Sequence, residues 1–508
     1  MRKKLLFILL NILIPLNLIA TTFKVATYNV ENLFDLYYNN REYPEYIPFT
    51  GFRWNEDTFH KKINNIAKVL CDLDADIVAL QEIESPYVLN TLVKKINEKG
   101  CKNYKYKSIV DDNYKIPIRS AILSTFPIVE SSDINIEGDY RDILKVTVKI
   151  NDAKLLIYVN HWPSKRYPES HRVYTARKLL EDLKNLKKGT DYIILGDFNS
   201  NYNEYLTFRY NRLFNKLNNT KGITGINHIL KTVEGGQLVD KFFIINRDYP
   251  FYHYNLWLEL PKHERYSYIF RNRKETPDNI ILSPYLFDNK SISYIDRSFN
   301  VFKKSYLFKD SEIFRWQRAK SGKAWHLGKG YSDHLPIYAN FNDKPFKLKQ
   351  DFNDIKTTNI KDLYKIKKAE FKAILKDCVI IYKNNYSCIL KRKNDRAIYC
   401  YKCLDRFGLN GIYDILIHKL KNFHGLTEIV SATVINYKGK EKKISDYYLK
   451  CNKETDFNAN INEVCSKVVG LYKDGYLYIG EKKIKLYTKK HIKLKNNKKI
   501  LLKKVRIS

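Results

Sequence analysis

Beyond its first 20 residues, the chain has no apolar run long enough to cross a bilayer, and no internal repeat is visible. A spanning helix needs about 20 consecutive apolar residues, so no membrane span is expected in the later sequence. Hydrophobic residues make up 44% of the 508 positions and aromatic residues 14%. A chain of this composition can bury apolar cores, which excludes disorder as the dominant state. Its length suits roughly two to four domains.

Acidic residues are scarce relative to basic ones. The sequence has 55 Asp and Glu against 90 Lys and Arg, a formal net charge of +35. Such a balance favours polyanionic partners such as nucleic acid or an anionic membrane surface, although a genome that overuses Lys explains part of it. The excess is uneven: from Asp343 onward there are 39 Lys and Arg and 17 Asp and Glu, so +22 of the +35 lies there.

Residues 1–20 resemble a secretory signal. Arg2, Lys3 and Lys4 precede an apolar run, and Ala20 is a plausible cleavage point. A permanent anchor is the alternative. We therefore expect an exported protein, periplasmic or extracellular, without a stable membrane anchor. Eight Cys in such a protein permit disulfides, but the sequence leaves their pairing open, as it leaves the oligomeric state.

Hydrophobic periodicity predicts an α/β protein with a mixed sheet arrangement. Strands are expected at 23–30, 76–83, 120–124, 143–150, 155–159, 193–195 and 278–283, and helices at 55–70, 85–98 and 170–188. We predict a catalytic domain over residues 21–342 and a linker over 343–361. A basic β-rich domain with a Lys-rich tail is predicted over 362–508, with short strands from Phe371 to Ile435.

Polar residues follow several of these strands at the point where each ends. They are Asn29, Glu82, His161, Asp197 with Asn199, and Asp333 with His334. Strand ends of α/β sheets are where ligand crevices form. Each cluster alone is weak, because a single His or a polar turn is more often structural. All of them in one chain indicate a site for a metal ion or for proton transfer.

The segments YNVENLF, QEIE, NHWPS, GDFN, DNIILS and GYSDHLPI, in this order, resemble the endonuclease/exonuclease/phosphatase family. The resemblance covers about residues 22–341. It implies an α/β four-layer sandwich of two mixed β-sheets flanked by helices. It also implies a metal-dependent phosphoric diester hydrolase, with Mg²⁺ as the cofactor and Mn²⁺ or Ca²⁺ as alternatives.

Site roles follow from the same resemblance. The metal ligands implied are Asn29, Glu31, Glu82 and Asp333, since carboxylate and carboxamide oxygens suit a hard cation. The catalytic residues implied are His161, Asp197, Asn199, Asp278 and His334. Asp197 and Asn199 would activate the attacking water and hold a phosphate oxygen, while Asp278 would orient His334. Either His161 or His334 would be the general acid. Arg119 and Arg172 are the expected phosphate contacts.

The carboxy-terminal part, from Gly411 to Ile429, more weakly resembles the small OB-fold domains of bacterial extracellular nucleases. OB barrels bind nucleic-acid strands in a basic groove with stacking aromatic residues. We therefore expect a nuclease that hydrolyses DNA, or RNA, with low sequence specificity. The alternatives are a phosphodiesterase acting on sphingomyelin or on a small phosphorylated substrate, and a catalytically decayed, polyanion-binding envelope protein.

Overall fold

The computed structural model describes residues 21–111, 116–208, 219–234, 237–246, 251–348, 355–366, 370–384, 387–401, 407–423, 425–487 and 495–507. The predicted signal segment, residues 1–20, lies outside them. The chain divides into two compact units, residues 1–232 with 250–348, and residues 233–249 with 349–508. None of the helices in the described residues has the length and apolar character needed to cross a membrane.

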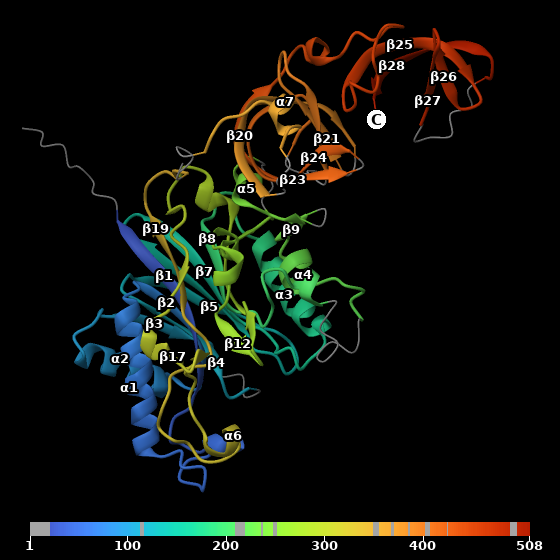
Figure 1. Cartoon of the computed structure of the whole chain (residues 1–508). Helices are drawn as coiled ribbons and strands as arrows, with labels where there is room; N and C mark the ends of the chain where they lie inside the picture. The colour runs from blue at the N-terminus through green and yellow to red at the C-terminus, as the bar shows by residue number, and fades with distance from the viewer. Residues whose placement is uncertain are drawn as a thin grey trace, which may run out of the picture. The chain divides into compact units, whose positions relative to one another are not determined.

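Two mixed β-sheets form the centre of the first unit (Figure 1). The first has the order β15 (Ser293–Tyr294), β19 (Ile337–Asn342), β1 (Thr22–Leu33), β2 (Ile77–Ile83), β4 (Arg119–Ser124) and β3 (Tyr106–Ile109), with β16 (Asn300–Val301) also on β19. The second has the order β11 (Tyr254–Asn255), β14 (Asp278–Leu282), β8 (Tyr192–Asp197), β7 (Ala153–His161), β6 (Ile143–Ile150) and β5 (Ile128–Ile134). β1 with β2 and β7 with β8 are parallel pairs, and the others are antiparallel.

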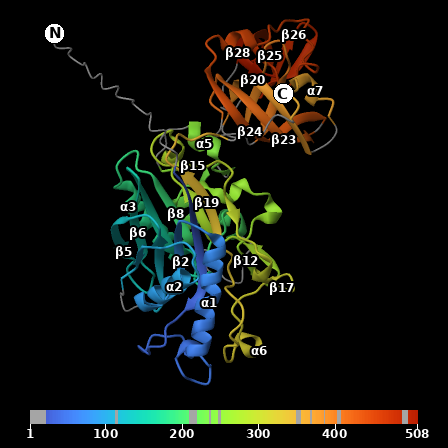
Figure 2. The ribbon, with the colours of Figure 1, turned by 90° about the vertical axis from the view of Figure 1, so that its left-hand side faces the viewer.

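The sheets pack face to face, with β1 and β2 against β8, and helices cover both outer faces. Figures 1 and 2 show α1 (Glu56–Leu73) and α2 (Pro86–Glu98) beside the first sheet. Helix α3 (Glu169–Lys184) buries Ala176, Leu179 and Leu183 against Tyr158 and Ile194 of the second sheet. The predicted four-layer α/β sandwich is confirmed.

Local sequence signals fix the two helices beside the first sheet. Asn55 caps α1 in a reciprocal capping box with Thr58, which satisfies backbone donors that have no partner inside the helix. Ser85 caps α2, and Pro86 occupies its first position. A disulfide from Cys71, in the last turn of α1, to Cys101, just after α2, ties the two helices together.

Most of the elements between β8 and β19 are short, and the sequence pattern predicted none of the following. They are α4 (Glu204–Thr207), the π-helical turn η3 (Gly225–Ile229), η4 (Leu256–Glu259), the hairpin of β12 (Tyr268–Phe270) and β13 (Arg273–Glu275), η6 (Pro284–Phe287), the hairpin of β17 (Phe308–Lys309) and β18 (Glu312–Ile313), and α6 (Ala319–Gly322). Strands of two or three residues carry no readable alternation, which is why the sequence pattern missed them.

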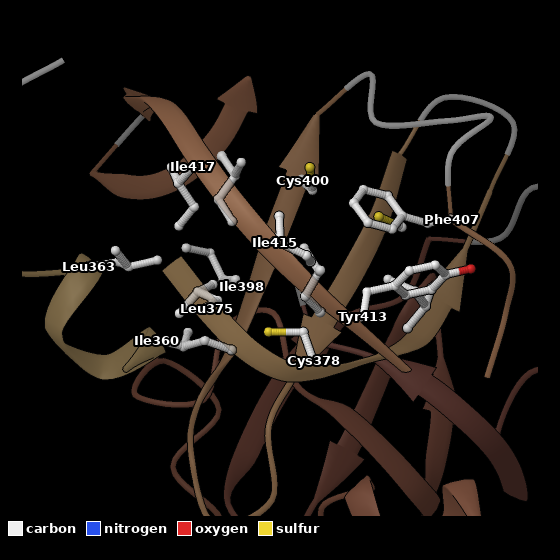
Figure 3. Close-up of a cluster of buried hydrophobic side chains, with 14 of the residues drawn as sticks. Ile360, Leu363, Leu375, Cys378, Ile398, Cys400, Phe407, Tyr413, Ile415 and Ile417 are labelled. Atoms are coloured by element: carbon white, nitrogen blue, oxygen red, sulfur yellow. The ribbon is translucent and has the colours of Figure 1, made fainter. Parts of the chain in front are cut away.

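The second unit contains a closed five-stranded barrel, as an OB-like domain requires. Its order is β20 (Glu370–Lys383), β21 (Ser387–Lys391), β22 (Ala397–Tyr401), β24 (Leu426–Lys440) and β23 (Gly411–Phe423), with β22 parallel to β24. Figure 3 shows Ile360 and Leu363 pointing into its core beside Leu375 and Ile398. Both come from α7 (Ile360–Leu363), so the predicted linker 343–361 is wrong at its end: Ile360 is fully buried and belongs to the barrel.

The predicted Lys-rich tail is instead part of a four-stranded antiparallel sheet. Its order is β27 (Lys482–Lys485), β26 (Tyr476–Ile479), β25 (Val464–Lys473) and β28 (Lys498–Arg506). Apolar residues between the lysines, among them Ile484, Ile500 and Leu502, pack on one side of it and make an ordered sheet possible. Residues 233–249, predicted inside the catalytic domain, group with the second unit, where α5 (Lys241–Asn246) contacts β24.

Gly196 is required where β7 and β8 run side by side. Its φ is +128°, and a Cβ atom there would lie 2.0 Å from the carbonyl oxygen of Asn160, its partner in register. No L side chain fits such an approach to backbone, because both strands are fixed in the sheet. This close contact sets the chain direction just before Asp197.

We predict that Gly196→Ala lowers the free energy of unfolding of the first unit by about 3 kcal/mol or more. Gly189→Ala is the matched control, since Gly189 also has positive φ (+89°) but has nothing within 4 Å of a Cβ; it should cost only about 1 kcal/mol. All five Trp lie in the first unit, so tryptophan fluorescence during urea unfolding of the whole chain reports on this unit. Equal losses in the two variants would contradict the steric argument.

Candidate active site

Three acid and imidazole side chains meet at one end of the second sheet. Asp197, the last residue of β8, pairs in register with His161 on β7 and with Asp278 on β14. All three are buried, and Asp278 is fully so. Because neighbouring strands lie about 4.8 Å apart, register pairing places these residues side by side. The structure thus brings together three of the five predicted catalytic residues on adjacent strands.

Asn29 connects this group to the first sheet. Its Nδ2 donates to Glu82 Oε1 at 3.0 Å and to Asp197 Oδ2 at 3.1 Å, and its Oδ1 accepts from the backbone N–H of Glu31 at 3.0 Å. Glu82 also accepts from the backbone N–H of Asn32 at 2.7 Å through Oε2. One carboxamide therefore holds a carboxylate from each sheet. In this arrangement Asn29 positions Glu82, and its direct binding of a metal stays a prediction.

The backbone is unusual at three of these positions. Glu31, Glu82 and Asn199 have φ values of +54°, +69° and +46°, in the left-handed region that side-chain-bearing residues rarely adopt. The pairing of β1 with β2 shifts register between Asn29 and Leu33, next to Glu31. Bulges of this kind re-aim side chains at sheet edges. Strain held by the surrounding structure is typical of functional sites.

Glu82 and Asp197 are two carboxylates that share one neutral neighbour. His161 Nε2 lies 3.7 Å from Glu82 Oε1 and 3.7 Å from Asp197 Oδ2, and its Nδ1 is buried without a hydrogen-bond partner. Burial, reinforced by Arg141, lowers the pKa of His161 well below its usual range. Burial likewise raises the pKa of Asp197 to about 6, with Asp278 and Glu82 adding to the effect. Within the described residues, neither carboxylate forms an ion pair with Lys or Arg.

His334 is held in a different state. Its Nδ1 lies 2.7 Å from Asp278 Oδ2, which also accepts from Ser267 Oγ at 2.5 Å. Burial alone opposes protonation, but the Asp278 carboxylate and its hydrogen bond raise the pKa of His334 well above the usual range. With Nδ1 occupied, Nε2 is the nitrogen left for other partners, and it lies 4.0 Å from Asp333 Oδ1. The predicted pairing of Asp278 with His334 is present in the structure.

The Glu31 carboxylate is bonded to Arg315 and Trp316 rather than placed beside Glu82. Its Oε1 accepts from the Arg315 guanidinium and its Oε2 from the backbone N–H of Trp316 at 3.0 Å, so both carboxylate oxygens are in use. Arg315 also lies 3.4 Å from Asp333 Oδ2. Burial and then Asp333 raise the pKa of Glu31 to about 7. Arg315 thus pairs with Glu31 and lies near Asp333, and the metal-binding roles of both acids stay predictions.

The prediction that Arg172 contacts phosphate is wrong. Its side chain is fully buried, pairs with Glu169 Oε2 at 2.8 Å, and donates to the carbonyl oxygens of Pro163 and Ser164. Arg172 thus holds the loop after His161 in place. Arg119 is half-buried and donates to the carbonyls of Glu84 and Val110, so its phosphate contact stays a prediction. Asn199 Nδ2 donates to the carbonyl of Trp162 at 3.0 Å, which orients the same loop.

Several residues around the site had no role in the sequence interpretation. Ser332 Oγ donates to the carbonyl of Asn29 at 2.7 Å, and the Tyr268 ring lies 4.8 Å from the His334 ring. Ser267, Arg315 and the buried Lys62, whose Nζ donates to the Glu31 carbonyl, complete the surroundings. Ser332 lies inside the GYSDHLPI segment and was open to prediction. The others come from stretches without a motif, where only the fold reveals their proximity.

A further group of possible ligand atoms is present. Asp197, Asp278 and His334 each offer one ligand atom, and these atoms lie within 4.8 Å of one another. Asp278 and His334 already bond to each other, so Asp197 is the member shared with Glu82. The site thus has a carboxylate side, Glu82 with Asp197, and an imidazole side, His334 with Asp278.

A family model described as the Endonuclease/Exonuclease/phosphatase family matches residues 24–239. This part of the chain carries Asn29, Glu82, His161 and Asp197, and it is similar to that family, as the motifs had indicated. Members of the family are metal-dependent phosphoesterases and nucleases.

Several solved structures are similar to part of the chain. A humanised TDP2 from D. rerio with 14 mutations is 15% identical, and the alignment covers 63% of this chain and 99% of that one at a TM-score of 0.38. TDP2 from C. elegans is 13% identical, with 63% and 75% covered and a TM-score of 0.36. A family protein from Bacteroides thetaiotaomicron is 17% identical, with 64% and 99% covered and a TM-score of 0.38. Comparison with curated proteins by sequence found no match.

We predict that Asp278→Asn lowers the pKa of His334, because the carboxylate charge that favours the imidazolium is lost. Ser267→Ala is the control with the opposite sign. It removes a donor that stabilises the same carboxylate oxygen, so it should raise the pKa of His334. NMR titration of the histidine ring resonances measures both. A shift in the same direction in the two variants would refute the assigned pairing.

Proposed function

We propose that this chain is an exported, metal-dependent phosphodiesterase that hydrolyses DNA with low sequence specificity. The observation that carries the proposal is the meeting of Glu82, Asp197 and His161 around Asn29, beside the hydrogen-bonded pair of Asp278 and His334. An acid pair for a cation and two imidazoles in different protonation states are what phosphodiester hydrolysis needs.

The carboxylate side of the site fits a divalent cation. Asn29 brings Glu82 and Asp197 together. Within the described residues, the one basic side chain within 4 Å of these carboxylates is His161, and burial favours its neutral form. Two carboxylates so placed are costly unless a positive charge joins them. Oxygen donors of this kind suit Mg²⁺, with Mn²⁺ or Ca²⁺ as alternatives. Glu82 would hold the ion, which when bound neutralises phosphate charge and polarises the diester.

Side chains of the protein would activate the attacking water and protonate the leaving oxygen. Asp197, with Oδ1 fixed by the backbone N–H of Asn199 at 2.8 Å, is placed to orient and deprotonate an attacking water. The Asp278 carboxylate raises the pKa of His334 and so favours its protonated form, in which Nε2 can donate to a phosphate oxygen or to the leaving oxygen. We assign the general acid to His334 rather than His161, because burial keeps His161 neutral. His161 then accepts or relays a proton beside the two carboxylates.

Export and substrate class rest on other features. Disulfides such as Cys71–Cys101 and Cys451–Cys465 persist in oxidising compartments, which supports a periplasmic or extracellular location. The charge of +35 supports a polyanionic substrate such as a nucleic acid.

A lipid phosphodiester is the second candidate, and exposed aromatic residues favour it. Tyr37, Tyr38 and Phe49 are 65%, 58% and 68% exposed in the segment between β1 and α1. Aromatic rings placed in this way can insert at a membrane interface, and they can equally stack on bases. The Tyr- and Trp-rich stretch before Asp278 does not add to this, since Trp257 is fully buried.

We predict that the secreted protein begins at Thr21, which amino-terminal sequencing would check. This protein should nick supercoiled plasmid when Mg²⁺ is present. EDTA should abolish the nicking and added Mg²⁺ should restore it, because Glu82 and Asp197 need a cation to act on a phosphate. Sphingomyelin vesicles are the parallel substrate. Cleaved lipid with intact DNA would replace the main proposal by the second candidate. Inactivity on both would favour the decayed, polyanion-binding alternative.

We predict that Asp197→Asn, Glu82→Gln and His334→Asn each lower DNA cleavage by about 10²- to 10⁴-fold. Asp152→Asn and His60→Asn are matched controls on exposed positions, the first in the turn at the opposite end of β7 and the second on α1. Initial rates at saturating Mg²⁺ measure the effect, with thermal unfolding to confirm folding. Full activity of Asp197→Asn would rule out the proposed water activation.

A further inference from the structure

The face by which an OB barrel usually binds its ligand is covered here by the protein itself. In OB folds the second and third strands present that face; in this barrel they are β21 and β22. Ile389 and Ala397 on their outer side are fully buried, together with Val464 from the start of β25. Ile444, Tyr447 and Tyr448 pack onto the same cluster.

Polar contacts hold this cover in place. Glu463 accepts from Lys391 Nζ on β21 and from the backbone N–H of Ala397 on β22, the latter at 2.9 Å. The guanidinium of Arg506 lies 4.3 Å from the centre of the Tyr399 ring on β22. The surface through which we expected the barrel to bind nucleic acid is therefore taken up by residues 444–464 and the end of β28. Polyanion binding has to use another part of this unit.

The terminal sheet offers such a surface. Along β25, Lys467, Val469, Leu471 and Lys473 are exposed, while Val468 and Gly470 between them are buried. The register places Lys503, Leu501 and Lys499 of β28 opposite Lys467, Val469 and Leu471. On the other side, Tyr478 and Tyr476 of β26 lie between β25 and Lys483 and Lys485 of β27. We call this set of alternate residues the open sheet face.

Charge and exposure on the open sheet face define what it can bind. Val469, Leu471 and Leu501 form its centre and are 43%, 42% and 53% exposed. Lysines surround them, and none of the four strands carries Asp or Glu. A second copy of the same face is excluded as an occupant because lysines would meet lysines. The occupant must be negatively charged and have flat or apolar parts.

The shape and the tyrosines favour a nucleic-acid strand over a membrane. A pocket of about 510 Å³ borders the face: Lys467, Val469, Leu471, Tyr478 and Lys499 of the face line it together with Val468, Gly470, Ile479, Gly480 and the segment Cys451–Lys453. The ammonium of Lys483 lies 4.3 Å from the Tyr476 ring centre and 6.0 Å from that of Tyr478. Proteins bind single strands by placing the phosphates on basic side chains and stacking the bases on aromatic ones. The open sheet face offers lysines for the first and tyrosines, with aliphatic side chains beside them, for the second. A bilayer would instead need apolar side chains that protrude.

We infer that the open sheet face binds single-stranded DNA through its phosphates and bases. This site lies outside the candidate active site and outside the barrel face. The inference deepens the proposed function, since it names the polymer that the enzyme would hold while cutting, and it rests on that function only for the choice of DNA.

Binding of a labelled single-stranded oligonucleotide to the whole chain, measured by fluorescence anisotropy in EDTA, tests the inference without cleavage. Lys467→Gln with Lys499→Gln and Lys503→Gln should weaken binding about tenfold or more at low salt. It should also make the slope of log affinity against log salt shallower by about 2, since each lost phosphate contact on a single strand removes about 0.7. Tyr478→Leu should weaken binding about tenfold without changing the salt slope.

Three exposed barrel lysines provide the matched control. Lys419→Gln with Lys421→Gln and Lys440→Gln removes the same charge from β23 and β24 and should leave affinity and slope nearly unchanged. Equal weakening by the two triple variants would reduce the effect to net charge and overturn the inference. So would unchanged affinity in the first variant. Binding of phosphatidylglycerol vesicles, lost in the first variant while DNA is not bound at all, would assign the face to membranes.

Failure of the inference and failure of the proposed function are separable. Hydrolysis of bis(4-nitrophenyl) phosphate with Mg²⁺ by the unchanged chain needs no polymer site, so it tests the diesterase chemistry alone. A chain that hydrolyses this small diester but binds DNA equally well with and without Lys467, Lys499 and Lys503 keeps the function and loses the inference. If the chain does not hydrolyse the diester but the three lysine substitutions weaken its DNA binding, the inference stands and the proposed function is refuted.

Discussion

The candidate site depends on one carboxamide. Asn29 extends from the first sheet and donates to Glu82 on β2 and to Asp197 on β8 of the second sheet. Two carboxylates from separate sheets repel each other in a buried setting, and the amide N–H groups between them lessen that cost. The register of β8 with β7 and β14 then fixes His161 and Asp278 relative to Asp197. Because Asn29 bonds to both carboxylates, the packing of the two sheets determines the geometry of the site.

The divided protonation of the two imidazoles follows from which partner each one has. His334 has a carboxylate at 2.7 Å, which raises its pKa against the effect of burial. His161 has carboxylates only at 3.7 Å and an unpartnered Nδ1, so burial prevails. Two chemically identical side chains thus become suited to opposite roles. The difference lies in about one ångström of separation from the nearest acid.

Strand ends were predictable from the sequence because polar residues after buried runs are visible without a structure. Asn29, Glu82, His161 and Asp197 were placed in this way, and Asn55 and Ser85 marked their helices correctly. Arg172 was misassigned because its partner Glu169 follows from packing rather than from a motif, and the contact of Glu31 with Arg315 was missed for the same reason. The sequence did not reveal the terminal sheet, because an alternation of Lys with Ile or Leu is the same in a solvated segment and in a half-buried strand.

The covered barrel has a consequence for how the chain is made. Strands β20 to β24 are complete by Lys440, but the apolar outer side of β21 and β22 is closed only by residues 444–464 and by Arg506, close to the end of the chain. During synthesis, which proceeds from the amino terminus, Ile389 and Ala397 therefore face solvent until residues 444–464 have followed. Residues 444–464 thus cover an apolar surface that the barrel cannot bury by itself, and a chain cut short after β24 would leave that surface exposed.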